Sequence, residues 1–395
     1  MPNQFLSPEG DLENYFVTEY QLIDQYIGDE LWTWGRGSEG QLGDNTATGK
    51  STPVTTFAGG TNWKQVSAGS NHCAAIKTDG TLWTWGGGNY GQLGTNDTTE
   101  RRTPVTTFAG ETNWKQVSAG FRYCAAIKTD GTLWTWGRGN YGQLGNNNTT
   151  ERRTPVTTFA GGTNWKQVSG GYSHCAAIKT DGTLWTWGYG GRGQLGNNST
   201  TNRTTPVTTF AGGTNWKQVN LGRLHSAAIK TDGTLWTWGW GSFGRLGNGV
   251  TTGNIITPVT TFAGGTNWKQ VSGGYGHCAA IKTDGTLWTW GYGNNGQLGN
   301  NTATDKPTPV TTFAGGTNWK QVSSGDRHCT AIKTDGTLWN WGFGNDGQLG
   351  NNTATTFTFT PVTTFAGGTN WKQVSAGGYH CAAVTAGINP VYPLS

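Results

Sequence analysis

Residues 77–86 read KTDGTLWTWG, and this stretch decides the fold because it returns along nearly the whole chain. Its core, LWTWG, begins at seven positions, with the last copy spelled LWNWG: Leu31, Leu82, Leu133, Leu184, Leu235, Leu287 and Leu338. The spacing is 51 residues, apart from one gap of 52. A fixed period of this length is typical of a repeat architecture, in which neighbouring units share one core.

One repeat, residues 63–108, predicts four short antiparallel strands. Strand A is WKQVSAG (63–69), strand B is HCAAIKT (72–78), strand C is TLWTWG (81–86) and strand D is TPVTTF (103–108). The Asp79-Gly80 pair between B and C predicts a two-residue type I′ hairpin turn. Pro104 cannot donate a ladder hydrogen bond, so we expect strand D at a sheet edge. Four strands repeated seven times predict an all-β fold, a seven-bladed β-propeller with four-stranded antiparallel blades.

The tryptophans predict how the blades pack. The repeat accounts for 21 of the 22 tryptophans, and Trp240 is the exception. Side chains alternate along a strand, so Trp83 and Trp85 share a face and, with Trp63, can fill the gap between adjacent blades. We also expect each blade to bury an apolar set, which in this repeat is Val66, Ile76, Leu82, Leu93, Val105 and Phe108.

The two ends of the repeat region predict ring closure. The first A–B pair starts at Trp63 and the last at Trp371, whereas the C–D pairs start at Leu31 and Leu338. The region therefore begins with an unpaired C–D unit and ends with an unpaired A–B unit. We expect residues 31–57 to pair with residues 371–385 in one composite blade, which removes the open edges. The expected domain is 31–386, followed by a C-terminal tail at 387–395.

Residues 1–30 do not belong to the repeat and carry seven acidic residues without Lys or Arg. Apolar residues spaced by three and four predict a short helical leader. Two interpretations stay open: the leader packs on the propeller, or it anchors the propeller to a larger assembly. The sequence has neither the basic-then-apolar pattern of a signal peptide nor eighteen consecutive apolar residues, which predicts no membrane span and an intracellular or particle-incorporated protein.

The histidines and cysteines recur at template positions rather than in one unique constellation. Six histidines share one position, six cysteines follow at the next, and Tyr123 and Ser226 are the exceptions. Adjacent strand residues point to opposite faces, so a His-Cys step is poorly placed to bind one ion. We expect buried structural side chains, no metal, no cofactor and no catalytic residues, and therefore not an enzyme.

A Gly-x-x-His-Cys step followed by DGxLWxWG and GQLG resembles the regulator of chromosome condensation repeat, over residues 31–386. The resemblance implies a seven-bladed propeller closed between its termini. Nucleotide-exchange members use acidic loop residues and a protruding insertion, for which the nearly constant repeat length leaves no room. The ultraviolet-B photoreceptor of plants places Trp directly after the glycine of the A–B step. No Trp stands there in this chain, where the residues are Ser70, Phe121, Tyr172, Arg223, Tyr275, Asp326 and Gly378.

Two segments vary between repeats, the A–B step and the long C–D loop, and antiparallel topology brings both to one face. All twelve arginines lie in these segments together with many aromatic residues. Tyr, Trp and Arg dominate binding hot spots. The predicted binding residues on this face are Arg122, Arg138, Tyr141, Tyr172, Tyr189, Arg192, Arg223, Trp240, Phe243, Tyr275, Tyr292, Arg327, Phe343 and Tyr379.

These observations favour a non-enzymatic recognition or scaffold propeller that binds a protein or a cell-surface glycan through this face. A leader followed by a head of near-identical repeats also suggests an attachment or structural component of a virus particle. A chromatin or nucleic-acid binding protein is the first alternative, since residues 31–395 hold 27 basic and 15 acidic residues, a balance of +12. A guanine nucleotide exchange factor is the second alternative, disfavoured by the missing insertion.

Overall fold

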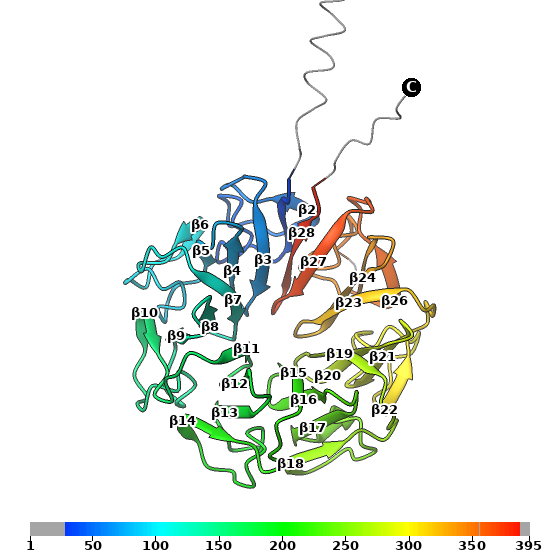
Figure 1. Cartoon of the computed structure of the whole chain (residues 1–395). Helices are drawn as coiled ribbons and strands as arrows, with labels where there is room; N and C mark the ends of the chain where they lie inside the picture. The colour runs from blue at the N-terminus through cyan, green and yellow to red at the C-terminus, as the bar shows by residue number, and fades with distance from the viewer. Residues whose placement is uncertain (1–27, 355, 388–395) are drawn as a thin grey trace, which may run out of the picture.

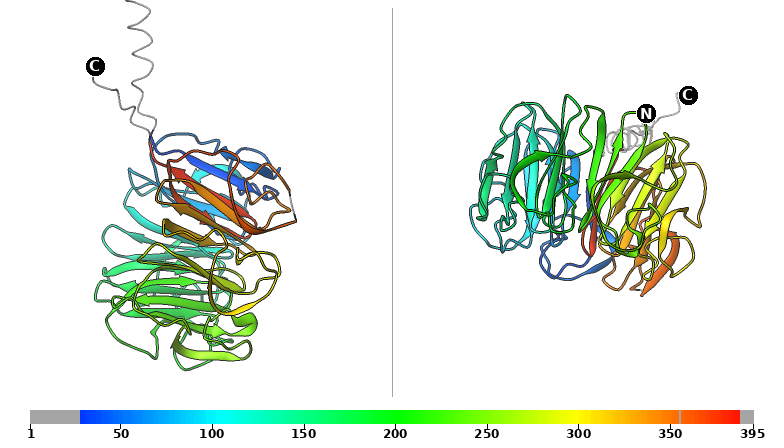
Figure 2. Two further views of the ribbon diagram at one scale, coloured as in Figure 1. Left: turned by 90° about the vertical axis from the view of Figure 1, so that its right-hand side faces the viewer. Right: turned by 90° about the horizontal axis from the view of Figure 1, so that it is seen from below.

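The computed structural model describes residues 28–354 and 356–387, which form a closed ring of seven four-stranded antiparallel sheets (Figure 1). Each sheet runs in the order A-B-C-D, with A next to the central axis and D at the outer edge. Figure 2 shows the resulting thick disc from two further sides. The predicted seven-bladed propeller is confirmed. The helix predicted in residues 1–30 falls on 1–27, outside the described residues.

The strand bounds repeat closely from blade to blade. The A strands are β3 (Trp63–Ala68), β7 (Trp114–Ala119), β11 (Trp165–Gly170), β15 (Trp216–Leu221), β19 (Trp268–Gly273), β23 (Trp319–Ser324) and β27 (Trp371–Ala376). The B strands are β4 (His72–Lys77), β8 (Tyr123–Lys128), β12 (His174–Lys179), β16 (His225–Lys230), β20 (His277–Lys282), β24 (His328–Lys333) and β28 (His380–Thr385).

The C strands are β1 (Leu31–Gly35), β5 (Leu82–Gly86), β9 (Leu133–Gly137), β13 (Leu184–Gly188), β17 (Leu235–Trp240), β21 (Leu287–Gly291) and β25 (Leu338–Phe343). The D strands are β2 (Lys50–Thr55), β6 (Arg101–Thr106), β10 (Arg152–Thr157), β14 (Arg203–Thr208), β18 (Asn254–Thr260), β22 (Lys306–Thr311) and β26 (Phe357–Thr363). A single 3₁₀ turn, η1 (Ser242–Gly244), is described in the C–D loop of blade 4. Blades 1 to 6 are numbered from β3, and blade 7 combines the two ends of the chain.

Blade 7 has the strand order β2-β1-β28-β27, so blue and red strands meet in Figure 1. Strand β1 pairs with β28 in register from Leu31 opposite Val384 to Gly35 opposite His380. Every sheet therefore has neighbours on both sides, and no blade presents a free inner face.

Glutamine in the NWKQV repeat joins the A strands around the axis. The Nε2 of Gln65 donates to the Val117 carbonyl at 3.1 Å, and its Oε1 accepts from the Val117 N–H at 3.1 Å. Between blades 7 and 1, Gln373 makes the same pair of bonds to Val66, at 2.9 and 2.8 Å. A serine two residues on adds a third bond, as when Ser67 accepts from the Ala119 N–H at 2.9 Å. The repeated Gln and Ser thus satisfy backbone groups that would otherwise lack partners.

The core lies between blades, as the tryptophan pattern predicts. Trp63 and Trp85 of blade 1 are fully buried and pack in one cluster with Ala382 of blade 7. The Nε1 of Trp85 donates to the Gln41 carbonyl at 3.0 Å. A β-carbon on Gly43, the last residue of a GQLG copy, would lie 2.9 Å from that indole, which explains the glycine. Each indole therefore fixes the preceding C–D loop as well as filling the space between sheets.

Two details of the predicted blade are wrong. The B–C connection is a three-residue loop: Gly80 has φ 81° but Asp79 does not have positive φ, and Gly80 N–H donates to the Lys77 carbonyl. The cause is the Asp79 carboxylate, which accepts from both the N–H and the hydroxyl of Thr81, at 2.9 and 2.7 Å. Phe108 is 66% exposed and Val105 is only half-buried, because both lie at the outer edge of the blade, Val105 in β6 and Phe108 just after it.

Candidate functional site

The A–B steps and the C–D loops meet at one end of the propeller, which we call the variable face. In each of the seven blades a backbone N–H at the start of the C–D loop donates to a carbonyl in the A–B step of the same blade. Examples are Arg138 to Arg122 at 2.9 Å and Trp240 to Leu224 at 2.9 Å. The scaffold therefore holds both variable segments of each blade in one register, from which different side chains project in different blades.

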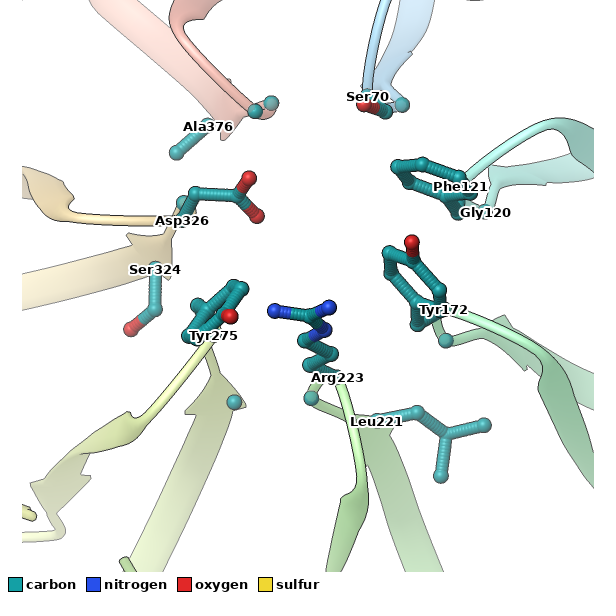
Figure 3. A pocket seen from close by; sticks show the side chains of 18 of the residues that line it. Ser70, Gly120, Phe121, Tyr172, Leu221, Arg223, Tyr275, Ser324, Asp326 and Ala376 are labelled. Carbon is teal, nitrogen blue, oxygen red and sulfur yellow. The ribbon is translucent and has the colours of Figure 1, made fainter. Parts of the chain in front are cut away.

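The A–B steps surround a cavity of about 90 Å³ on the propeller axis, which we call the axial mouth (Figure 3). Phe121 and Tyr172 stack with ring centroids 3.8 Å apart. The Arg223 guanidinium lies 4.7 Å from the Tyr172 ring and 4.0 Å from the Tyr275 ring. Four consecutive blades thus contribute one continuous stack of flat groups around half of the mouth.

Asp326 faces this stack from blade 6. Figure 3 shows the side chains of Arg223 and Asp326 both directed into the mouth. Burial raises the pKa of the Asp326 carboxyl to about 7, while Arg223 and Arg327 act to lower it. Within the described part of the chain no ion pair within 4 Å involves Asp326. The mouth therefore offers a guanidinium edge on one side and a carboxyl group on the other.

A second group of predicted residues runs outward over blades 1 to 3. The Nη1 of Arg122 donates to the Tyr90 hydroxyl at 2.9 Å, and its guanidinium also covers the Phe121 ring at 4.9 Å. Arg138 lies 5.9 Å from the Tyr141 ring, which packs 5.1 Å from Tyr189. This group is continuous with the axial mouth through Phe121.

A third group occupies the C–D loops of blades 3 to 5. Arg192 lies 5.5 Å from the Trp240 ring, Trp240 packs 6.2 Å from Phe243, and Phe243 packs 5.0 Å from Tyr292. Arg245 lies beneath them, with its guanidinium 4.1 Å from the Trp240 ring. Arg245 is missing from the predicted set, although the change from GQLG to GRLG at this position is visible in the sequence.

The remaining predicted residues form a fourth group over blades 6 and 7. Arg327 lies 6.0 Å from the Phe343 ring, and Phe343 packs 6.2 Å from Tyr379. Beside them a depression of about 650 Å³ opens between two C–D loops, with Arg36 and Asp346 in its lining. All fourteen predicted residues thus fall in four neighbouring groups on the variable face, and their role in binding stays a prediction.

The histidines form a belt inside the ring, as expected for structural residues. His72 Nε2 lies 3.2 Å from Cys124 Sγ of the next blade, and His225 Nε2 lies 3.0 Å from Cys278 Sγ. Burial lowers the pKa of His72 to about 4. Where Ser226 replaces cysteine, its hydroxyl lies 3.0 Å from His174 Nε2. Among the described residues, no three His, Cys, Asp or Glu side chains lie together in a way that could hold a metal ion.

The fold and the variable face together define a class: a ring propeller whose repeated frame presents non-repeated aromatic and arginine side chains at one end. Two family descriptions match the sequence, the RCC1-like domain over residues 27–262 and the regulator of chromosome condensation (RCC1) repeat over residues 284–332 and 335–384. The chain belongs to the RCC1 repeat family.

Relatives differ in how much of their length the chain spans. The ultraviolet-B receptor UVR8 of Arabidopsis thaliana is 34% identical over 82% of this chain and 75% of that protein. The E3 ubiquitin-protein ligase HERC2 of Mus musculus is 28% identical over 91% of this chain, but the match spans 8% of the ligase. The ligase name therefore describes a protein of which this chain resembles a small part.

Solved structures support the fold. Prp20p of Saccharomyces cerevisiae, described together with its binding to Gsp1p and histones, has a TM-score of 0.81 at 20% identity and covers 94% of this chain and 95% of its own. Human WBSCR16 has a TM-score of 0.79 at 20% identity, with coverage of 91% and 99%. At this identity the likeness concerns the fold alone. No helix in residues 28–354 and 356–387 has the length and apolar character that crossing a membrane requires.

Proposed function

We propose that this protein is a non-catalytic recognition propeller that binds another protein through the variable face, with the axial mouth at the centre of the contact. The observation that carries the proposal is the stack of Phe121, Tyr172, Arg223 and Tyr275. A cavity of about 90 Å³ lies well below the roughly 300–1,000 Å³ of small-molecule pockets. The mouth therefore suits one inserted side chain of a partner better than a free metabolite.

The stack is also organised before any partner arrives. Ring-to-ring and ring-to-guanidinium contacts hold Tyr172 and Arg223 in place, so little side-chain entropy is lost on binding. Both faces of the Arg223 guanidinium are covered by tyrosines, which leaves its N–H edge to face the mouth. A preorganised aromatic and arginine centre surrounded by polar loops is the composition of a binding hot spot.

The relatives agree with a protein partner. Prp20p is described in complex with Kap60 and in binding to Gsp1p and histones, and UVR8 is named a receptor. None of these descriptions concerns a glycan or a virus particle, so the glycan and particle-attachment hypotheses gain no support. A nucleotide-exchange role would require that the protein partner is a GTPase, and it stays an alternative form of the same proposal.

Nucleic acid is the alternative that the charge balance favours. Several arginines of the variable face are, however, engaged with acids of their own loops, as in Arg101 with Asp97 at 2.6 Å and Arg102 with Glu100 at 3.0 Å. Partial neutralisation lowers the number of phosphates that the face could contact. A steep fall of affinity with rising salt would favour nucleic acid, whereas weak salt dependence favours the protein partner.

The test compares how variants in the neighbouring blades 3 and 4 capture a partner from the natural source. Arg223→Ala, alone and combined with Tyr172→Ala, removes the centre of the stack. Lys217→Ala is the matched control, because Lys217 is exposed at the opposite end of β15. We expect each truncation in the mouth to lower the affinity for the partner by about 30-fold, and the control variant to bind with the affinity of the wild type. Equal capture by the wild type and all three variants would refute a role for the axial mouth.

A further inference from the structure

Blade 4 breaks a contact that all other blades share. In six blades the glutamine of GQLG turns back, and its Oε1 accepts from the backbone N–H two residues earlier, at 2.8–2.9 Å. In blade 4 this position is Arg245, whose guanidinium has donors only. Arg245 cannot accept the hydrogen bond that the other loops depend on.

In this loop the peptide group between Ser242 and Phe243 is flipped relative to the other blades. The Nε of Arg245 donates to the Ser242 carbonyl at 2.8 Å, and Phe243 adopts φ 64°. None of the equivalent residues in the other six blades has a positive φ, and the described non-glycine residues that do are otherwise all asparagines. A left-handed backbone is unfavourable for phenylalanine, so the substitution stores strain in this loop.

Arg245 is also a buried cation without an acidic partner. The residue has no exposed surface, and burial lowers its pKa to about 10. Its Nη1 donates to the Tyr275 carbonyl at 3.2 Å, but its Nη2 has no hydrogen-bond partner among the described residues. The charged groups around it are Arg223 and Asp305, and the Asp305 carboxylate already accepts from the Gly293 N–H at 2.9 Å. Buried charges are normally paired, because an unpaired one is expensive.

The residue of blade 5 that lies next to Nη2 has no side chain. Gly276 occupies the second position of the A–B step, where every other blade has a side chain. A β-carbon at Gly276 would lie 3.7 Å from Nη2. Trp240, Phe243 and Tyr292 cover the guanidinium from the solvent side, and Phe243 is 41% exposed. A shift of the strained Phe243 would open the way to Nη2.

We propose that Arg245 is the anchor of a carboxylate-binding site, which accepts an acidic side chain or a C-terminal carboxylate of the protein partner beneath the ring of Phe243. This proposal depends on the proposed function in one respect only, that the carboxylate comes from a protein partner. The two N–H groups of Nη2, which have no partner and lie beside a glycine, suit a compact monoanion and fall short of the several donors that a phosphate group uses. Pairing with the guanidinium would offset the unfavourable burial of its charge.

The first measurement uses acetate alone and needs no partner. Replacing a bulky organic sulfonate by acetate at constant ionic strength should raise the Tm of the wild-type protein by about 1–3 °C in a saturable way. Arg245→Gln restores the glutamine of the other six blades and should remove this response. Side-chain ¹⁵N spectra provide a second readout. The Nε signal of Arg245 is assigned by its absence from R245Q, and acetate should shift it in the wild type.

Two further variants keep the test decisive. Gly276→Ala places a methyl group about 3.7 Å from Nη2 but keeps the arginine, so it should weaken acetate binding at least 5-fold. Arg102→Gln removes an exposed arginine in blade 1 that is not among the predicted binding residues, and it should leave the response unchanged. The absence of a saturable response in the wild type, or an equal response in R245Q, would overturn the site.

A competition experiment with peptides tests whether the carboxylate comes from a protein. A short peptide with a C-terminal carboxylate and a glutamate should compete with acetate, whereas its fully amidated glutamine analogue should not. Binding of acetate without binding of the acidic peptide would overturn the assignment to a partner protein. Failure here is distinguishable from failure of the proposed function, since that function is tested by partner capture with variants of Arg223 and Tyr172, whereas this site is tested by acetate binding with variants of Arg245 and Gly276.

Discussion

Replacing Gln373 by alanine removes two of the three side-chain hydrogen bonds between β27 and β3, where the two ends of the chain meet. Those bonds measure 2.9 and 2.8 Å and engage the backbone C=O and N–H of Val66. Two such bonds contribute about 1 kcal/mol each, and leaving a partly buried backbone group unpaired adds about 1 kcal/mol. We therefore expect the free energy of unfolding to fall by about 3 kcal/mol and Tm by about 5 °C.

Urea unfolding followed by tryptophan fluorescence measures the change, and Gln218→Ala is the control. Gln218 makes the same pair of bonds to Val271 between blades 4 and 5, at 3.2 and 3.0 Å. In a closed ring both substitutions remove equivalent contacts and should destabilise equally. If Q218A lowers stability but Q373A does not, the ring is open between blades 7 and 1 and the closure derived from the strand order is incorrect.

Three further predictions follow from the belt of histidines and from Trp240. Burial lowers the pKa of the histidines, to about 4 for His72, while in the unfolded chain they titrate near 6.5. The unfolded state therefore binds more protons, so stability is full above pH 6.5 and should fall toward pH 4 by about 1.4 kcal/mol per pH unit for each histidine. The raised pKa of Asp326 makes the folded protein more stable as the pH falls, but this is one group against six histidines. Midpoints of urea unfolding that stay constant from pH 7 to pH 5 would contradict the presence of buried neutral histidines. Cys278→Ser should change the free energy of unfolding by less than about 1 kcal/mol, since Ser226 already makes the equivalent contact to a histidine, and a larger loss in urea would show that the thiol is required. Trp240→Ala should weaken partner binding by about 2 kcal/mol in a titration, and an unchanged affinity with a lowered Tm would assign this indole a structural role.

The sequence predicts the frame of this protein well because the frame is periodic. Period, strand count and tryptophan spacing each follow from residues that repeat in every unit, so local pattern and packing agree. The errors arise where one side chain decides the geometry. Asp79 redirects its own turn by accepting from Thr81, and Phe108 lies beyond the reach of the next blade.

The candidate site is predictable as a face but not as a set of contacts. Phe121, Tyr172, Arg223 and Tyr275 come from four blades about fifty residues apart, and only the closed ring shows that they stack in sequence. Asp326 belongs to the same ring of A–B steps, yet whether its carboxyl forms an ion pair with Arg223 depends on distances across the mouth. Arg245 can be recognised in the sequence, because it replaces the glutamine that the other six blades have at this position. Its effect on the loop backbone, through the hydrogen bond to the Ser242 carbonyl, is visible only in the structure.

Site-specific photo-crosslinking tests the central claim, protein recognition through the axial mouth, most directly. A photoreactive phenylalanine analogue replaces Phe121 in the mouth in one protein and Phe108 at the outer edge in another. Phe108 is 66% exposed and Phe121 is half-buried, so exposure alone would favour crosslinking from position 108. We predict a discrete crosslinked partner from position 121, lost in the Arg223→Ala background, and none from position 108. The same partner from position 108, or no crosslink from position 121, would contradict the proposed function.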